Sequence, residues 1–381
     1  MKAGQRIYLD YNASTPVAPE VAAVMRSTME TGFGNPSSQH WAGVPARRAV
    51  EKARHQVADL LGCAPEEVVF TSGGSEANNL ALKGAFFASS RPRRHIVTTG
   101  VEHLAIVAPC RFLERMGAEI TWLPVDGTGR IDPDDLRRTI TADTILISIM
   151  HANNEVGTIQ PIEDCAAIAG EYGIPLHSDA AQSVGKIPTR VADLGVDLLS
   201  IAGHKIYAPK GVGALYVRKG VALEPAMHGA DHEGGRRAGT ESAMLTAALG
   251  EACVLASDLS DMERVKALRD RFWSALQNRF GSAVVLNGHP EKRLPNTLNA
   301  SFVGHVGAEI LARLDGVAAS TGSACHSGRI ELSPVLEAMA VPPEVGMGAV
   351  RLSLGRGTAD EDVETVVETL SDVLLSAREE S

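Results

Sequence analysis

The first two thirds of the chain alternate short apolar runs with longer stretches in which apolar residues recur every three or four positions. The short runs predict strands and the periodic stretches predict amphipathic helices. Strands are predicted at residues 68–71, 95–99, 119–123, 144–149, 174–178, 197–201 and 213–217. Helices are predicted at residues 45–61, 75–87, 103–116, 133–140 and 162–172. This alternation indicates βαβ units, and hence a mostly parallel sheet covered by helices on both faces.

The pattern changes between residues 240 and 261, where a domain boundary is predicted. A long helical pattern at 261–280 then leads into strand patterns at 284–286, 297–302 and 350–354, followed by an acidic final helix. The sequence therefore predicts an α/β fold. It consists of a large domain with a seven-stranded, mostly parallel sheet and a smaller α+β domain.

Composition narrows the class of protein. The 381 residues carry 36 basic and 46 acidic side chains, and 44% are hydrophobic. Such values are typical of a globular chain and exclude collagen, coiled coil and disorder. No apolar run approaches the roughly 18 residues of a membrane helix, and the N-terminus lacks a signal pattern, so no membrane contact is expected. A net charge of −10 without a basic run argues against direct nucleic-acid binding.

The negative charge is concentrated at the end of the chain. Residues 359–381 hold eight acidic side chains and one arginine, a net of −7, so the other 358 residues sum to −3. A solvated helix face is the favoured interpretation, and a partner-binding surface is the alternative.

The five cysteines are widely spaced, at positions 63, 110, 165, 253 and 325. No C-x-x-C pair is present, so a zinc ribbon is excluded and no metal site is expected. An odd count without a secretion signal indicates a reducing, cytoplasmic compartment.

Polar residues cluster directly after the predicted strands, where ligands bind in open α/β sheets. The segment SGGSEANN at 72–79 suggests a phosphate site at a helix N-terminus, or simply a turn with Ser75 as N-cap. The other strand ends supply His103, the HANN segment at 151–154, Asp179 and Lys205. A desolvated lysine can form a Schiff base, although Lys205 could equally be ion-paired, and Lys210 is a rival.

Taken together, these strand ends match the requirements of pyridoxal 5′-phosphate (PLP). That cofactor needs a lysine, a carboxylate for its ring nitrogen, an anion site and a stacked ring. No single strand end is specific, but the combination is.

At this point the sequence resembles the cysteine desulfurases of the NifS/IscS group, in the class V aminotransferase superfamily of fold type I PLP enzymes. The resemblance runs nearly end to end. It rests on IYLDYNASTP at 7–16, FGNPSS at 33–38, TSGGSEANN at 71–79, HANNEVGTIQP at 151–161, DAAQSVGK at 179–186, GHKIYAPKGVGALYVR at 203–218, RRAGTES at 236–242, STGSACHSG at 320–328 and VRLSLGR at 350–356.

The resemblance implies a role for each matching position. It implies that Lys205 forms the Schiff base and that His103 stacks on the cofactor and acts as an acid or base. The implied cofactor-binding set is completed by Gly74, Ser75, Asp179, Gln182, His204 and Thr240, with Thr240 reaching the phosphate of a neighbouring subunit in a homodimer. Asn154 and Arg351 would bind the carboxylate of L-cysteine. The implied domains are 14–255, which binds PLP, and 1–13 with 256–381, which carries the reactive-cysteine loop.

Cys325 distinguishes this family's chemistry, because the thiolate is the nucleophile. It lies in TGSACHSG, where small residues suit a loop that delivers a thiol and His326 could lower its pKa. The resemblance implies that Cys325 takes the sulfur of L-cysteine as a persulfide, releases L-alanine and passes the sulfur to a protein acceptor. The other four cysteines are expected in helical, apolar surroundings as small buried side chains.

The sequence departs from the family pattern at three positions and leaves other functions open. Ala202 replaces a serine that would bind the phosphate, Ser75 replaces a threonine, and His326 follows the reactive cysteine. The chain also ends soon after its last helix, without the extension that docks the iron–sulfur scaffold in longer relatives. The sulfur could serve Fe–S cluster assembly, tRNA thiolation or DNA phosphorothioation. A selenocysteine lyase, an aminotransferase and a non-catalytic sulfur carrier remain alternatives.

Overall fold

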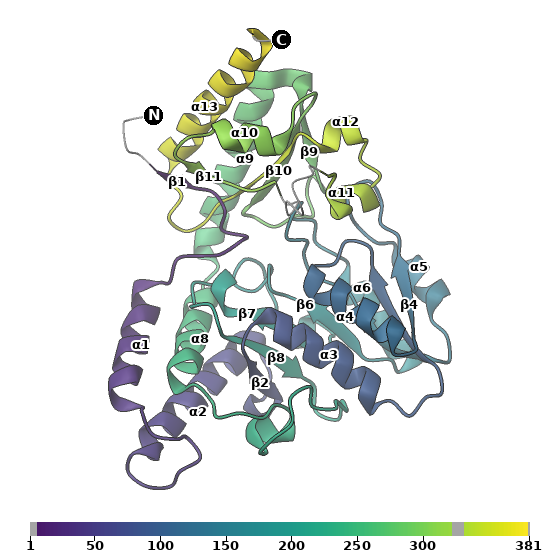
Figure 1. Cartoon of the computed structure of the whole chain (residues 1–381), viewed down its shortest axis with the longest axis vertical. Helices are drawn as coiled ribbons and strands as arrows, with labels where there is room; N and C mark the ends of the chain where they lie inside the picture. The colour runs from purple at the N-terminus through teal and green to yellow at the C-terminus, as the bar shows by residue number, and fades with distance from the viewer. Residues whose placement is uncertain (1–5, 322–330, 380–381) are drawn as a thin grey trace.

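The computed structural model describes residues 6–321 and 331–379, and it has a large lower part and a small upper part in Figure 1. Cys325 and His326 lie outside the described residues. The lower part contains the long sheet and helices α1 to α8, whereas the upper part contains β1 and all elements from α9 onward.

The large part is built on a seven-stranded sheet, as the sequence predicts. Its strands are β2 (Val68–Thr71), β3 (Arg94–Thr99), β4 (Ala118–Leu123), β5 (Thr144–Ser148), β6 (Leu176–Asp179), β7 (Leu198–Ala202) and β8 (Gly213–Val217). Their order is β2-β8-β7-β6-β5-β3-β4, and only β8 runs antiparallel to its neighbours. The central strands β5 and β7 are buried along their whole length, which explains their continuous apolar sequence.

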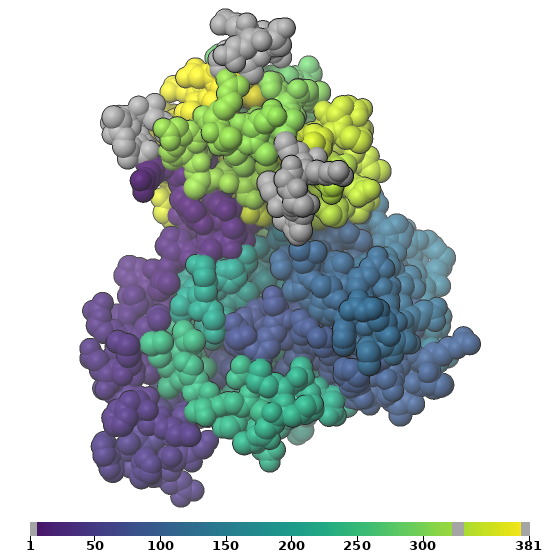
Figure 2. Space-filling view, viewed as in Figure 1, coloured from purple at the N-terminus to yellow at the C-terminus, as the bar shows by residue number. Residues whose placement is uncertain are grey.

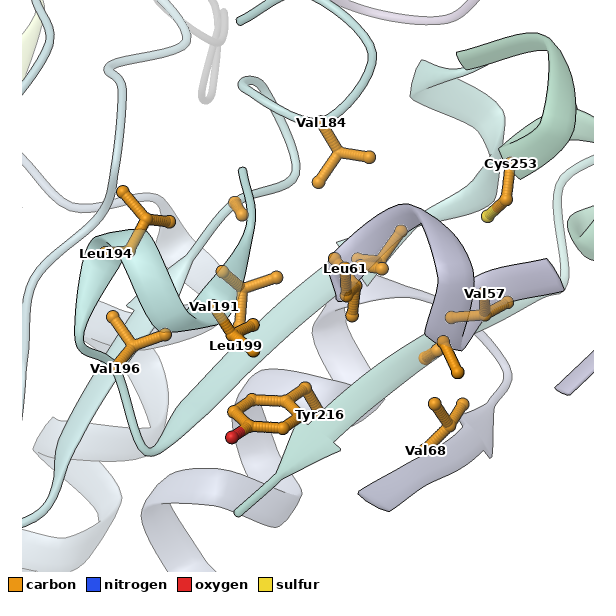
Figure 3. Packing of buried hydrophobic residues seen from close by; sticks show 14 of the residues in the cluster. Val57, Leu61, Val68, Val184, Val191, Leu194, Val196, Leu199, Tyr216 and Cys253 are labelled. Atoms are coloured by element: carbon orange, nitrogen blue, oxygen red, sulfur yellow. The ribbon is translucent and has the colours of Figure 1, made fainter. Parts of the chain in front are cut away.

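Helices cover this sheet. They are α1 (Pro19–Thr31), α2 (Gly43–Leu61), α3 (Gly74–Ala88), α4 (Leu104–Arg115), α5 (Pro133–Thr139), α6 (Ile162–Tyr172), α7 (Val191–Leu194) and α8 (Ala243–Ala256), with short turns η1 (Pro65–Glu67), η2 (Gly203–Lys205) and η3 (His232–Gly235). Helix α2 buries an apolar stripe that includes Val57 and Leu61. Figure 3 shows this stripe beside Val68, Leu199 and Tyr216 of the sheet.

Helix α8 occupies most of the segment where the sequence predicts a domain boundary. It is rich in small residues and packs against α1 and α2. Gly250 allows this close approach, because a Cβ there would lie 2.7 Å from the Cα of Ala53. No single helix in 6–321 and 331–379 is long and apolar enough to cross a membrane. Helices α8 and α9 pass that test only as a pair, and they are bent by 70°.

The small part surrounds a separate apolar core. It contains α9 (Ser260–Phe280), η4 (Gly281–Ala283), β9 (Val284–Asn287), β10 (Thr297–Phe302), α10 (Gly307–Arg313), β11 (Val317–Ala318), α11 (Pro334–Ala338), α12 (Pro343–Gly346), β12 (Ala349–Ser353) and α13 (Asp360–Glu379). Strands β12, β10 and β9 form an antiparallel sheet, and β1 (Ile7–Tyr8) pairs with β11. Leu9 therefore shares a core with Phe272, Phe302 and Leu370, far along the chain. The acidic side chains Glu361, Glu364 and Glu368 of α13 are exposed.

Two expectations need correction. Strand β6 begins two residues later than predicted, because Gly173 caps α6 in a left-handed conformation (φ 62°), and Asp179 is the last strand residue. Cys110, Cys165 and Cys253 are buried in helices as expected, but Cys63 is only half-buried and follows the end of α2. Its context is therefore not helical.

A buried ion pair holds a strained turn against the sheet. Glu233 has a left-handed backbone (φ 50°), which is uncommon for a residue other than glycine. Its carboxylate accepts hydrogen bonds from Arg54 Nη1 (2.8 Å), from Arg54 Nη2 (2.9 Å) and from the Phe70 amide (2.8 Å). The bidentate pair therefore fixes the η3 turn beside β2.

Replacing Arg54 by methionine should destabilise the protein by about 3–5 kcal/mol, because Glu233 would be left buried without its cation. Denaturant unfolding of the purified protein measures this change. Arg138→Met, which removes the exposed pair with Asp135, is the matched control and should cost at most about 1 kcal/mol. Equal effects of the two variants would contradict the role assigned to the Arg54–Glu233 pair.

Candidate active site

One cavity of about 450 Å³ gathers residues from the strand ends of the large sheet and from β12. Strands β2, β6 and β7 run parallel to one another, so their carboxyl ends meet at the same edge. The cavity lining includes nine of the predicted site residues: Gly74, Ser75, His103, Asn154, Asp179, Gln182, His204, Lys205 and Arg351. The rival Lys210 lines it as well and is exposed.

The turn between β2 and α3 forms one wall of the cavity. Gly73 has φ 150° and ψ −179°, a conformation that is essentially restricted to glycine. A Cβ on Gly74 would lie 3.1 Å from the Cβ of Ala202, so the backbone of the turn packs closely on β7. Helix α3 begins at Gly74 without a side-chain cap, so Ser75 is not the N-cap. The free N–H groups of this 15-residue helix suit a phosphate.

Asp179 is held by two donors at the end of β6. Its Oδ2 accepts a hydrogen bond from Asn78 Nδ2 (2.6 Å), and its Oδ1 accepts one from the Ala181 amide (2.9 Å). These two donors fix the orientation of the carboxylate, which lines the cavity. A carboxylate held in this way suits a cofactor with a protonated ring nitrogen.

Lys205 lies at the end of η2 and is anchored to the beginning of the chain. Its Nζ donates to the carbonyl oxygens of Asn12 (2.6 Å) and Ala13 (2.8 Å). Burial, followed by the positive charge of Arg351, lowers the pKa of Lys205 to about 8. The amine is thus more nucleophilic at neutral pH than an ordinary lysine.

Two histidines lie beside Lys205. His103 is the N-cap of α4, and its Nδ1 accepts a hydrogen bond from the Ala105 amide (3.1 Å). Burial lowers the pKa of His103, opposed by Asp179 and reinforced by Lys205. Burial and the neighbouring Lys205 lower the pKa of His204 to about 4. Both rings are therefore neutral near pH 7. Because Nδ1 of His103 accepts the amide hydrogen bond, its ring hydrogen lies on Nε2, which can donate.

Arg351 projects from β12 of the small part and is held at two points. Its Nη2 pairs with Asp10 Oδ1 (2.8 Å), and its Nη1 donates to the Asn154 carbonyl (3.1 Å). It is a buried pair rather than a surface one. Its Nε is buried without a hydrogen-bond partner among the described residues, so the guanidinium retains donor capacity for a carboxylate.

Thr240 does not line this cavity, and its side chain is exposed. Cys325 belongs to the part of the chain that the structure does not describe.

Sequence reasoning missed three residues of this region. Asn12 contacts Lys205 and Gln182, Asn78 orients Asp179, and Lys186 contacts Gln182. All three lie inside motifs that carry the family resemblance, which was the available signal. The contacts of Asn12 with Lys205 and of Asn78 with Asp179 join segments that are distant in sequence, so spacing alone could not reveal them.

Known proteins resemble this chain over nearly its full length. The aminotransferase class-V family model matches residues 7–366. The cysteine desulfurase IscS of Dictyoglomus turgidum is 49% identical over 378 residues, covering 98% of this chain and 96% of that protein. A solved NifS-like protein has a TM-score of 0.91 at 35% identity and covers 97% and 99% of the two chains. The structure of SspA in complex with cysteine has a TM-score of 0.83 at 36% identity and covers 93% and 100%.

The chain thus belongs to the aminotransferase class-V family and, within it, to the PLP-dependent cysteine desulfurases of the NifS/IscS group. The cavity fits PLP on its own chemistry. It offers a helix N-terminus, a carboxylate with fixed donors and an amine with a lowered pKa. The amide oxygen of Asn78, buried without a partner among the described residues, also faces this region.

The lowered pKa of Lys205 predicts how fast the apoprotein captures PLP at each pH. With a pKa of about 8, about one amine in ten is neutral at pH 7, so the rate should rise with pH and level off above about 8. Stopped-flow absorbance measures this profile. Arg351→Met should move the midpoint upward because it removes a cation that lowers the pKa. A wild-type rate that keeps rising to pH 10 would refute the prediction.

Proposed function

We propose that this chain converts L-cysteine to L-alanine with PLP and takes the sulfur as a persulfide on Cys325. The observation that carries the proposal is the convergence of Lys205, Asp179, His103 and Arg351 on one cavity. The relatives named cysteine desulfurase and the SspA complex with cysteine support the choice of substrate.

We assign the cofactor to the large part of the cavity. Lys205 would carry it covalently, Asp179 would pair with its ring nitrogen, and His103 would stack on its ring. Gln182 would donate to the ring oxygen, and the phosphate would lie on the first turn of α3 with Gly74, Ser75 and His204. Bound in this way, PLP supplies an electron sink for the carbanion that forms at the substrate Cα.

Arg351 and Asn154 would bind and orient the carboxylate of L-cysteine. Because Asp10 and the Asn154 carbonyl fix the guanidinium, its fork is positioned before the substrate arrives. Lys205 Nζ would accept the Cα proton, and neutral His103 would donate a proton from Nε2 beside it.

The thiolate of Cys325 would then attack the substrate sulfur. The new S–S bond forms as the Cβ–S bond breaks, and the electron pair stays with the carbon skeleton. That skeleton takes up protons and leaves as L-alanine, while the persulfide passes to a protein acceptor. This step separates the proposed activity from an aminotransferase or a selenocysteine lyase on the same fold, and from a sulfur carrier without turnover.

Replacing Cys325 by alanine should lower alanine formation from L-cysteine more than about 100-fold, because the nucleophile is lost. The visible absorbance of bound PLP should be unchanged. Cys63→Ala is the control and should keep full activity, because burial raises the pKa of the Cys63 thiol to about 12. Mass spectrometry after incubation with L-cysteine should find the extra sulfur on Cys325. Sulfur on another cysteine, or full alanine formation by Cys325→Ala, would exclude the proposed step.

We also propose that the protein is a homodimer in which Thr240 serves the phosphate of the neighbouring subunit. The projecting end formed by α1 and α2 supports this, and Figure 2 shows it in purple at the lower left. Phe33 and Trp41 are 72% and 80% exposed, with ring centroids 6.2 Å apart, and Met29 is 62% exposed. Such a concentration of exposed apolar side chains is typical of an interface.

Trp41→Glu should therefore shift the protein from dimer to monomer in analytical ultracentrifugation, since it places a charge in the contact. Its affinity for PLP should fall together with the dimer, because Thr240 would no longer reach the neighbouring phosphate. Met116→Glu alters the C-cap residue of α4, which is 51% exposed, and it should leave the dimer intact. A dimeric Trp41→Glu variant would argue against this surface.

We infer a cytoplasmic location from the free cysteines and the family's chemistry. The sulfur acceptor is proposed to be a protein, in Fe–S cluster assembly, tRNA thiolation or DNA phosphorothioation. Direct contact with nucleic acid is not part of the proposal.

A further inference from the structure

Lys186 is a lysine enclosed behind the proposed cofactor cavity. Its side chain is 8% exposed and lies four residues after Gln182. It does not line the cofactor cavity. Together with Lys205 and Tyr207 it lines a separate cavity of about 20 Å³. Lys186 therefore acts on the site through other side chains rather than by touching the cofactor.

The hydrogen bonds of Lys186 orient two side-chain amides. Its Nζ donates to Gln182 Oε1 (2.8 Å) and to Asn12 Oδ1 (3.3 Å). In these two hydrogen bonds each amide turns its oxygen toward Lys186 and its nitrogen away. The Nε2 of Gln182 then donates one hydrogen to the Asn12 carbonyl (2.9 Å), and its second hydrogen remains for the cavity that Gln182 lines.

A lysine at this position has a physical cost. Burial, followed by the positive charges of Lys205 and Arg351, lowers the pKa of Lys186 well below its ordinary value. The lysine nitrogen carries at least two N–H groups in either protonation state, enough for the two amide oxygens it contacts. A methionine would occupy similar volume without burying a polar group, so the N–H groups are what distinguish lysine here.

We propose that Lys186 is a positioning residue that holds the Gln182 amide with one N–H directed into the cofactor cavity. The proposal rests on the role proposed above for Gln182 toward the ring oxygen of PLP. Linked hydrogen bonds polarise one another, so donation by Lys186 to Oε1 also makes the opposite N–H a stronger donor.

A double-mutant cycle tests this coupling in the full-length protein. Lys186→Met and Gln182→Leu should each weaken PLP binding about 3- to 10-fold, the effect of one hydrogen bond. The double variant should bind no more weakly than Gln182→Leu alone, because Lys186 acts through Gln182. Titration of visible absorbance gives the dissociation constants, and the pH midpoint of that absorbance should move in the same direction in all three variants.

Two further variants keep the test decisive. Lys186→Gln retains a side-chain N–H donor and should recover part of the affinity, and it replaces Lys186→Met in the cycle if that variant does not fold. Lys219→Met changes an exposed lysine and should bind PLP as the wild type does. Additive losses in the cycle, or unchanged PLP affinity in Lys186→Met, would overturn the proposal.

The cycle is measured in a Cys325→Ala background, so it does not depend on sulfur transfer. Failure of the proposed activity would appear separately, as wild-type protein that forms no alanine while the coupling between Lys186 and Gln182 persists.

Discussion

The structure depends on a buried polar junction at Asn12, which is 1% exposed. Its backbone carbonyl accepts hydrogen bonds from Lys205 and Gln182, and its side chain contacts Lys186, Asn296 and Thr297. Its backbone N–H donates a hydrogen bond to the Ser353 hydroxyl of β12. Buried polar groups must find partners, and here the partners come from both parts of the molecule. The junction thus fixes the position of the small part relative to the proposed Schiff-base lysine.

Two side chains that line the same cavity, Lys205 and Asp179, have different electrostatic surroundings. Burial and a nearby cation lower the pKa of Lys205, whereas hydrogen-bond donors hold the carboxylate of Asp179. The cation near Lys205 is Arg351, and the donors to Asp179 are Asn78 and the Ala181 amide. Because Asp10 pairs with Arg351, the cation is held in place before any substrate carboxylate is present.

Much of the large part was predictable from local pattern. Continuous apolar runs identify β5 and β7 because parallel strands are buried on both faces. Strand β6 begins later than predicted because the left-handed cap at Gly173 follows α6, and an apolar run does not reveal such a cap. Helix α8 itself was not predicted within the boundary segment 240–261. Its small residues give little amphipathic contrast because the helix is buried against α1 and α2.

The sequence by itself determined the fold class, the family and nine of the residues that line the cavity, because strand ends and family motifs are local features of the chain. Only the tertiary structure decided what surrounds those residues. It brought four pairs into hydrogen-bonding contact: Asn12 with Lys205, Asn78 with Asp179, Asp10 with Arg351, and Lys186 with Gln182. These pairs are separated by up to 341 positions, except Lys186 and Gln182, which are four apart. The long-range hydrogen bonds among them form only when distant segments pack together, so the orientations of these side chains are properties of the folded molecule.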